Sequence, residues 1–235
     1  MHSSLLRFPK LYAKLIYLRK YPNFEKILYL KAIKSGDVVL DIGANYGYFT
    51  TLFSGLVSKC GEVHAFEPVP ETYKLLLENT RRLMPNIKAN NFAVGQKREK
   101  AVISYDINDS EKASLVHYCA SMTKKTETDV IPLDDYVQDN DLRRLDFVKC
   151  DVEGYELQAL RGMKRTLCEL TPQLSIEVTI NGKDRLSLFS FLKDLGYDSF
   201  KIIEKGYPDY HHCLNGVQDY FYLHAFSSKA SKLRA

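Results

Sequence analysis

The stretch from Val38 to Thr50 limits the chain to a small set of folds. Residues 38–42 place four apolar side chains in five positions, which is typical of a buried parallel strand. Gly43 and Gly47 follow, and glycine permits the positive φ that a tight turn or a close ligand requires. An apolar helix comes next, so its first N–H groups face the same ligand. The pattern predicts a strand–loop–helix unit that cradles a nucleotide.

The chemistry of this loop narrows the choice of ligand. Asp41 ends the strand, and its negative charge would repel a phosphate. A dinucleotide-binding loop requires G-x-G-x-x-G, but Asn45 occupies the position of the second glycine. A phosphate-binding loop of the Walker type is also excluded, because no Gly-Lys-Ser/Thr follows. The loop favours a ligand with a cationic or neutral polar tail, such as the amino-acid end of S-adenosylmethionine. A plain strand-to-helix turn is the structural alternative.

Composition is consistent with one globular domain. The chain has 235 residues, 45% of them hydrophobic and 26% charged. Its five cysteines lack C-x-x-C spacing and are expected to be reduced intracellular thiols. No apolar run suggests a membrane span and the first residues do not resemble a signal peptide, so we expect a cytoplasmic protein. The expected divisions are a basic helical segment (1–34), the main domain (35–226) and a flexible tail (227–235).

The positive charge is concentrated in the first segment. Residues 1–34 contain eight basic residues and one acid. Apolar and basic residues are interleaved over residues 5–20, a pattern that suits contact with an anionic membrane surface or with a phosphorylated partner. Pro9 and Pro22 divide it into short pieces, which favours short helices packed on the core instead. Basic residues are not enriched elsewhere, so nucleic acid is not an expected partner.

A second acid lies at the end of the next predicted strand, residues 62–68. Glu67 follows Asp41 by 26 residues. In a doubly wound sheet this position faces the ligand crevice, where a carboxylate can accept both hydroxyls of a ribose. Pro68 then directs the chain out of the strand. A solvated loop acid is the alternative interpretation.

The third predicted strand, residues 87–95, should bring Asn91, Phe92 and Ala93 to an adenine ring. A plain core strand would explain Phe92 almost as well. Residues 100–105 alternate like an antiparallel strand, within an insertion that we expect to form a hairpin or flap over the sheet edge. The aromatic loop at residues 207–212 is a further candidate for a substrate pocket.

A third group of acids follows the strand at residues 145–150. Asp151 and Glu153 lie at its end, and Glu177 ends the strand after it. Clustered carboxylates repel one another unless a cation, a proton or hydrogen-bond donors offset the repulsion. This repulsion could be offset by Lys149, by a sulfonium centre, by a divalent metal or by helix N–H groups. The alternative is a helix start whose acids suit the helix dipole.

Together these motifs resemble the FkbM family of S-adenosylmethionine-dependent methyltransferases. The matching elements cover about residues 36–180; they are residues 39–47, 66–68, 131–134, 148–156 and 160–162. The resemblance implies an α/β fold, a Rossmann-like doubly wound sheet of seven strands with the last one antiparallel. It also implies O-methylation of a hydroxyl on a sugar, glycan or glycosylated small molecule.

Site residues follow from these motifs. Those predicted to bind the cofactor are Asp41, Gly43, Ala44, Asn45, Gly47, Tyr48, Phe49, Glu67, Pro68, Asn91, Phe92, Ala93, Asp151 and Val152. Those predicted to act in catalysis are Lys149, Asp151, Glu153 and Glu177, and the candidate Mg²⁺ ligands are Asp151 and Glu177. We expect in-line methyl transfer, with an acid as base or metal ligand. The alternatives are a non-catalytic S-adenosylmethionine-binding module and an NAD(P)-dependent oxidoreductase.

Overall fold

The computed structural model of the protein describes residues 24–81, 86–105, 113, 115, 124–178, 182–204 and 221–227. The predicted membrane-contact segment, the aromatic loop at 207–212 and the tail after residue 227 lie outside this part of the chain. Within it, no helix has both the length and the apolar character needed to cross a bilayer.

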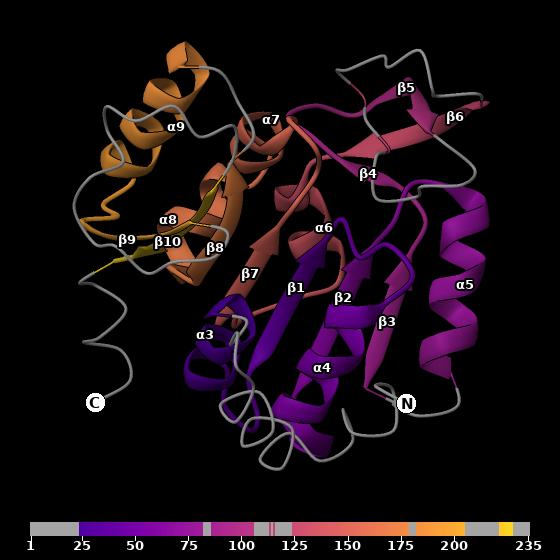
Figure 1. Ribbon diagram of the computed structural model, residues 1–235, viewed down its shortest axis with the longest axis horizontal. Coiled ribbons are helices and arrows are strands. Elements are labelled where there is room, and N and C mark those ends of the chain that lie inside the picture. The colour runs from indigo at the N-terminus through magenta and orange to yellow at the C-terminus, as the bar shows by residue number, and fades with distance from the viewer. Residues whose placement is uncertain are drawn as a thin grey trace.

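Seven strands of the described residues form one central sheet (Figure 1). In spatial order they are β3 (Ile87–Asn90), β2 (Glu62–Phe66), β1 (Val38–Ile42), β7 (Phe147–Cys150), β8 (Gln173–Val178), β10 (Phe221–Phe226) and β9 (Ser199–Glu204). The first five run parallel, whereas β10 runs antiparallel to β8 and β9. β1, β2 and β7 are almost wholly buried, as is typical of central strands in a parallel sheet that helices cover on both faces. The predicted, mostly parallel α/β sheet is confirmed.

The strand order reverses beside β1. β2 and β3 lie on one side of it, and β7 and β8 lie on the other. Connections therefore leave β1 and β7 in opposite directions, and a crevice forms outside their carboxyl ends. The register places Asp41 of β1 directly opposite Lys149 of β7. The predicted site residues at the strand ends are thus brought to one edge of the sheet.

Helices cover both faces of the sheet. They are α3 (Phe24–Ala32), α4 (Tyr48–Val57), the 3-10 turn η1 (Ser58–Cys60), α5 (Pro70–Arg81), α6 (Leu133–Asp139), α7 (Glu156–Arg161), α8 (Lys164–Leu170) and α9 (Gly182–Asp194). α3 and α4 pack against Val39 and Phe147, whereas α6 to α9 pack against Leu40 and Val148. Successive strand residues point to opposite faces, so each central strand contributes to both cores.

α3 belongs to the core of the domain. Tyr29 is fully buried, and its ring makes edge contacts with Phe49, Phe53 and Phe147. Its hydroxyl donates to Glu25 at 2.6 Å and lies 3.1 Å from Ser175 Oγ on β8. The described end of the basic N-terminal segment is therefore a core helix, whereas residues 5–20, for which packing on the core was the alternative to membrane contact, lie outside the described residues.

A second, three-stranded sheet lies beside the carboxyl end of the first. It consists of β4 (Ala93–Val94), β6 (Lys124–Ile131) and β5 (Glu99–Tyr105), in that order. β5 and β6 are antiparallel, which confirms the predicted antiparallel strand and hairpin. Tyr105 Oη and Lys124 Nζ both donate to Glu71 of α5, at 3.0 and 3.2 Å, and attach this small sheet to the domain.

One predicted element was wrong. The stretch 87–95, expected to be a single strand, is divided between β3 of the central sheet and β4 of the small sheet. Asn91 stands at the break, and its side-chain amide donates to the carbonyl oxygens of Glu67 and Pro68 at 2.8 and 3.1 Å. These bonds stabilise a bend that a β ladder would not allow.

Candidate functional site

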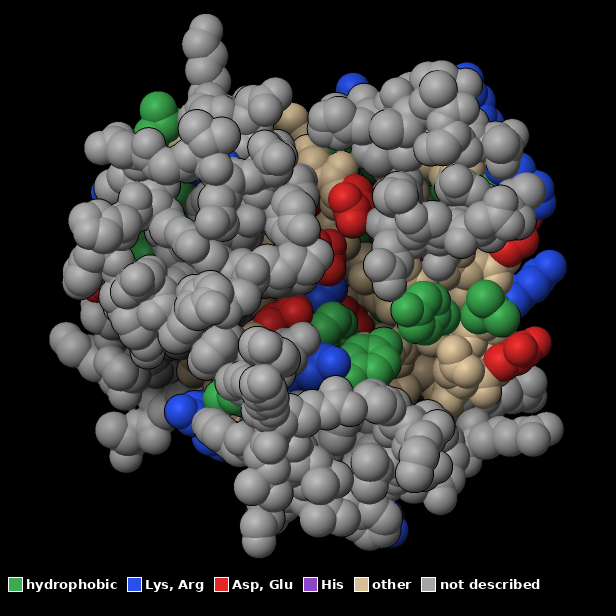
Figure 2. Space-filling model, viewed as in Figure 1, with side chains coloured by type: hydrophobic (Ala, Val, Ile, Leu, Met, Phe, Trp, Pro, Cys, Tyr) green, Lys and Arg blue, Asp and Glu red, His purple; other side chains and the backbone are tan. Residues whose placement is uncertain are grey.

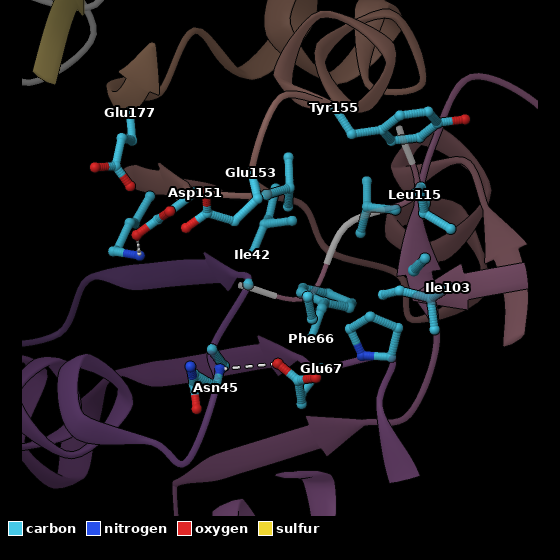
Figure 3. Close-up of a pocket in the computed structure, with 18 of the residues that line it drawn as sticks. Ile42, Asn45, Phe66, Glu67, Ile103, Leu115, Asp151, Glu153, Tyr155 and Glu177 are labelled. Atoms are coloured by element: carbon cyan, nitrogen blue, oxygen red, sulfur yellow. Dashed lines mark hydrogen bonds and ion pairs between the residues drawn. The ribbon is translucent and has the colours of Figure 1, made fainter. Parts of the chain in front are cut away.

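A cavity of about 270 Å³ opens at the carboxyl ends of β1, β2 and β7 (Figure 3). It extends from the small sheet on one side to the end of β8 on the other. Figure 2 shows a hollow on this face of the molecule, where acidic side chains gather. The cavity thus lies in the crevice that the strand order predicts.

The loop after β1 forms the floor of the cavity. Gly43 has a φ of 77°, and a Cβ at this position would overlap the carbonyl oxygen of Asp151. The N–H groups of Gly43 and Ala44 donate to the carbonyl oxygen of Phe66 at 3.1 and 2.9 Å. Asn45 follows with a φ of 50°. Glycine is therefore required at 43 because two loops meet there, in addition to the turn that its positive φ allows.

Glu67 lines the cavity at the end of β2. Its Oε2 accepts a hydrogen bond from the N–H of Asn45 at 3.0 Å, and its Oε1 accepts one from the N–H of Val69 at 2.9 Å. Burial raises the pKa of Glu67 to about 7, although both N–H groups act in the opposite direction. Each carboxylate oxygen has a second lone pair, so the group can accept two further hydrogen bonds from a ligand.

The wall on the small-sheet side is apolar. Phe92 packs against Phe66 with ring centroids 5.4 Å apart. Ile103 of β5, together with Leu115 and Tyr155, completes this side of the cavity (Figure 3). A flat, apolar ring system would be buried well by such a wall.

The opposite end is acidic. One carboxylate oxygen from each of Asp151, Glu153 and Glu177 lies within 4.8 Å of the others. Figure 3 shows all three directed toward the same end of the cavity. Burial and the nearby Asp151 raise the pKa of Glu177 well above its usual value. The predicted acidic cluster is therefore present as a spatial cluster.

Lys149 partly neutralises this cluster. Its Nζ lies 2.8 Å from Asp151 Oδ2 and 5.1 Å from the centre of the Phe49 ring, and its side chain is only 3% exposed. Burial by itself would lower the pKa of Lys149, but neighbouring carboxylates, first among them Asp151, outweigh it and raise the pKa. The lysine therefore remains charged inside the protein.

Three predicted cofactor-binding residues do not line the cavity. Asp41 is fully buried behind it and accepts a hydrogen bond from Thr50 Oγ1 at 2.6 Å. Gly47 starts α4 with a φ of 87°. Asn91 bonds to the loop that carries Glu67. These three residues lie behind or next to residues that line the cavity. Their direct contact with a ligand stays a prediction.

The structure brings the other predicted residues together. Those on the wall are Gly43, Ala44, Asn45, Tyr48, Phe49, Glu67, Pro68, Phe92, Ala93, Lys149, Asp151, Val152, Glu153 and Glu177. The sequence interpretation missed other lining residues, namely Ile42, Tyr46, Phe66, Val94, Ile103, Ala113, Leu115 and Tyr155. Strand alternation over residues 100–105 was a usable signal for Ile103, because it separates the inward side chains from the outward ones.

The sequence of the domain matches the family model described as the methyltransferase FkbM domain over residues 41–199. The chain belongs to the FkbM methyltransferase family. Every cavity-lining residue named above lies within this range, whereas α3 precedes it. This membership confirms the resemblance on which the sequence interpretation was based.

Two methyltransferases are similar to the chain in sequence. Hexuronic acid methyltransferase AglP of Haloferax volcanii is 30% identical over 71% of this chain and 66% of its own length. The 31-O-demethyl-FK506 methyltransferase FkbM of Streptomyces tacrolimicus is 26% identical over 56% of this chain and 61% of its own. The chain thus spans somewhat less than two thirds of these relatives.

Solved structures show the same fold. Methyltransferase FkbM from Methylobacillus flagellatus superposes with a TM-score of 0.53 at 19% identity, covering 86% of this chain and 52% of that one. Fibrillarin of Aeropyrum pernix, solved with natively bound S-adenosyl-L-methionine, gives a TM-score of 0.52 at 13% identity and covers 83% of this chain and 68% of that one. The FkbM domain described here therefore has the Rossmann-like fold of S-adenosylmethionine-dependent methyltransferases.

Proposed function

We propose that the protein is an S-adenosylmethionine-dependent methyltransferase that methylates a hydroxyl oxygen of a sugar, a glycan or a glycosylated small molecule. One observation carries the proposal. Carboxylates from neighbouring strand ends line a single cavity, with Glu67 near its apolar wall and Asp151, Glu153 and Glu177 at the other end. This arrangement suits a ligand with a ribose, an apolar ring and a positive charge.

The residues of the cavity fit this cofactor. The oxygens of Glu67 keep lone pairs for two ribose hydroxyls after they have accepted from Asn45 and Val69. Phe92 and Ile103 offer apolar surface to an adenine ring. The wall bears more carboxylates than basic groups, which favours a cationic sulfonium compound over a diphosphate.

The bound cofactor would supply a methyl group that its positive sulfur has already activated. What remains for the protein is to align the acceptor and to take its proton, because a sugar hydroxyl is a poor nucleophile at neutral pH. Glu153 lies on the cavity wall at the acidic end, where an acceptor hydroxyl could reach it. We assign the proton-accepting role to the group of Asp151, Glu153 and Glu177.

Mg²⁺ is the alternative use of the same three acids. Their spacing and oxygen ligands would suit the ion. However, Asp151 already pairs with the ammonium group of Lys149 at 2.8 Å, and this cation competes for the same carboxylate. We therefore place proton transfer ahead of metal binding. Activity that persists in EDTA would agree with this order, and activity that EDTA abolishes and Mg²⁺ restores would reverse it.

The acceptor class is inferred from relatives. AglP is named for methylation of a hexuronic acid, and the Streptomyces protein for methylation at an oxygen of FK506. Both names point to acceptors among carbohydrates and oxygenated natural products. We extend this class, as a proposal, to the present chain.

Two measurements test the proposal. Calorimetry should show binding of S-adenosylhomocysteine and none of NADH; the reverse result would favour an oxidoreductase. Incubation with methyl-labelled S-adenosylmethionine and fractionated cell extract should label a carbohydrate-containing fraction through a methyl ether. Cofactor binding without transfer to any fraction would indicate a non-catalytic binding module instead.

A substitution of Glu153 tests whether this acid acts in methyl transfer. Glu153→Ala should leave the dissociation constant for S-adenosylhomocysteine within a few-fold of wild type and abolish most of the turnover, because the side chain lies at the acceptor end. Unchanged turnover would remove Glu153 from the proposed mechanism.

A further inference from the structure

Glu156 is a buried acid directly behind the loop that carries the acidic cluster. It is the first residue of α7, and its side chain has no exposed surface. It does not line the cavity. A carboxylate in such a place requires an explanation, because burying a charged group is costly unless its hydrogen bonds are satisfied.

The contacts of Glu156 lie in the loop at residues 151–155. Its Oε1 accepts hydrogen bonds from the N–H of Gly154 at 2.9 Å and, more weakly, from that of Val152 at 3.4 Å. No hydrogen-bond partner of Oε2 is found in the described part of the chain. One oxygen of the fully buried Glu156 side chain therefore binds two N–H groups of the loop, which belong to residues two positions apart.

The loop has an unusual backbone conformation. Glu153 has a φ of 51° and Gly154 a φ of 95°, both in the left-handed region. This region costs a residue other than glycine roughly 1 kcal/mol or more and persists only where surrounding contacts impose it. The two N–H groups that Glu156 binds flank Glu153 on either side. Glu156 thus supplies contacts that can impose this conformation.

The other side of the loop is also held. The N–H of Asp151 donates to the carbonyl oxygen of Ile42 at 3.1 Å, and the backbone of Asp151 lies directly against Gly43. The loop is therefore enclosed between the floor of the cavity and Glu156. Within this enclosure Asp151, Val152 and Glu153 are all presented to the cavity.

We propose that Glu156 is a positioning residue, which holds the loop in the conformation that directs Glu153 and Asp151 into the acceptor end of the cavity. This inference rests on the proposed function, because it assigns those two acids to the methyl-transfer site. This role requires a hydrogen-bond acceptor at the position of Oε1. The side-chain carbonyl oxygen of glutamine can supply this acceptor, whereas alanine has none.

The test compares Glu156→Ala, Glu156→Gln and a control, Asp134→Ala. Asp134 is also a capping carboxylate, which accepts from the N–H groups of Arg165 and Thr166 at 2.9 and 2.8 Å, but it is not on the cavity wall. Its loss should lower the melting temperature and leave kcat unchanged. The control therefore measures the effect on kcat of a loss of stability alone.

Glu156→Ala should lower kcat about 100-fold, since a displacement of about 1 Å can cost that much. The substrates are methyl-labelled S-adenosylmethionine and the extract fraction that accepts label from wild type. KM and the affinity for S-adenosylhomocysteine should change much less, and Glu156→Gln should restore kcat to within a few-fold of wild type. Retained kcat in the alanine variant, or an equal loss in the glutamine variant or in Asp134→Ala, would overturn the inference.

Amide hydrogen exchange provides a second readout that needs no acceptor. Without the acceptor oxygen, the Val152 and Gly154 amides should exchange faster in Glu156→Ala but not in Glu156→Gln. Equal protection of these two amides in Glu156→Ala, Glu156→Gln and Asp134→Ala would refute the positioning role. If the wild-type protein transfers no methyl group at all, the proposed function fails, whereas this exchange comparison still decides whether Glu156 holds the loop.

Discussion

Lys149 Nζ lies 2.8 Å from Asp151 Oδ2, and this partly buried ion pair connects the core of the sheet to the cavity. Lys149 also stands opposite Asp41 in the register of β1 and β7. Its charge therefore faces carboxylates both behind the cavity wall and on it. A single lysine supports the folded state and the acidic end of the site together.

Loss of this lysine should be strongly destabilising. Lys149→Met removes the cation that Asp151 and Asp41 face, and the loss of one partner from a fully buried pair costs roughly 3–5 kcal/mol, which is an upper bound here because Asp151 is 22% exposed. The control is Lys88→Met, because Lys88 is 53% exposed and pairs with Glu62 at 3.0 Å. The control should change stability by about 1 kcal/mol or less. Urea denaturation measures both, and similar stabilities for the two variants would contradict the assigned role.

Removal of the acid at the end of β2 should weaken cofactor binding. Glu67→Ala eliminates the proposed ribose acceptor and leaves the N–H groups of Asn45 and Val69 unpaired, so S-adenosylhomocysteine should bind roughly 10- to 100-fold more weakly. Asp41→Ala should also weaken binding, through the loss of its bond to Thr50 on α4. Calorimetry decides both, and full-strength binding by either variant would remove that residue from the cofactor site.

The small sheet should contribute to cofactor affinity. Ile103 is 3% exposed and lines the cavity, whereas Val102, its neighbour on β5, is 57% exposed. Ile103→Asn places a polar group in the apolar wall and should reduce affinity for S-adenosylhomocysteine about 10-fold. Val102→Asn should have no effect, because its side chain points away. A calorimetric titration in which the two variants bind alike would show that the small sheet does not hold the ligand.

The contribution of His64 to the stability of the domain should be lost at mildly acidic pH. His64 is fully buried beside Tyr136 Oη, at 2.7 Å from Nδ1, and burial lowers the pKa of His64 from 6.5 to about 4. The unfolded state therefore gains a proton at a higher pH than the folded state does. This contribution is fully present above about pH 6.5 and is lost as pH falls from there toward 4, by roughly 2–3 kcal/mol, whereas buried acids with raised pKa values, such as Glu67, change stability in the opposite direction.

His64→Gln removes this titration and keeps a hydrogen-bonding group near Tyr136. Its stability relative to wild type should therefore increase when urea denaturation is repeated at pH 5 instead of pH 7. A constant difference between the two proteins at both pH values would mean that His64 does not titrate on unfolding.

The acids of the site could be found in the sequence because each lies at or shortly after the carboxyl end of a strand. Asp151, Glu153 and Glu177 all come after apolar runs, and parallel strands in a doubly wound sheet deliver their ends to one edge. Chain order alone therefore indicates their proximity. The local pattern did not reveal that Asn91 interrupts the third strand, because its bonds to Glu67 and Pro68 are made between separate segments.

The sequence by itself determined the strand–loop–helix unit after Val38, the mostly parallel sheet and the acidic ends of its strands, because hydrophobic period and turn residues act over a few neighbours. Only the tertiary structure decided that Asp41 lies behind the wall, that Ile103 and Leu115 complete it, and that Glu156 supports its acidic loop. These outcomes depend on packing between segments distant in the chain, where burial and hydrogen-bond partners are set by the whole fold.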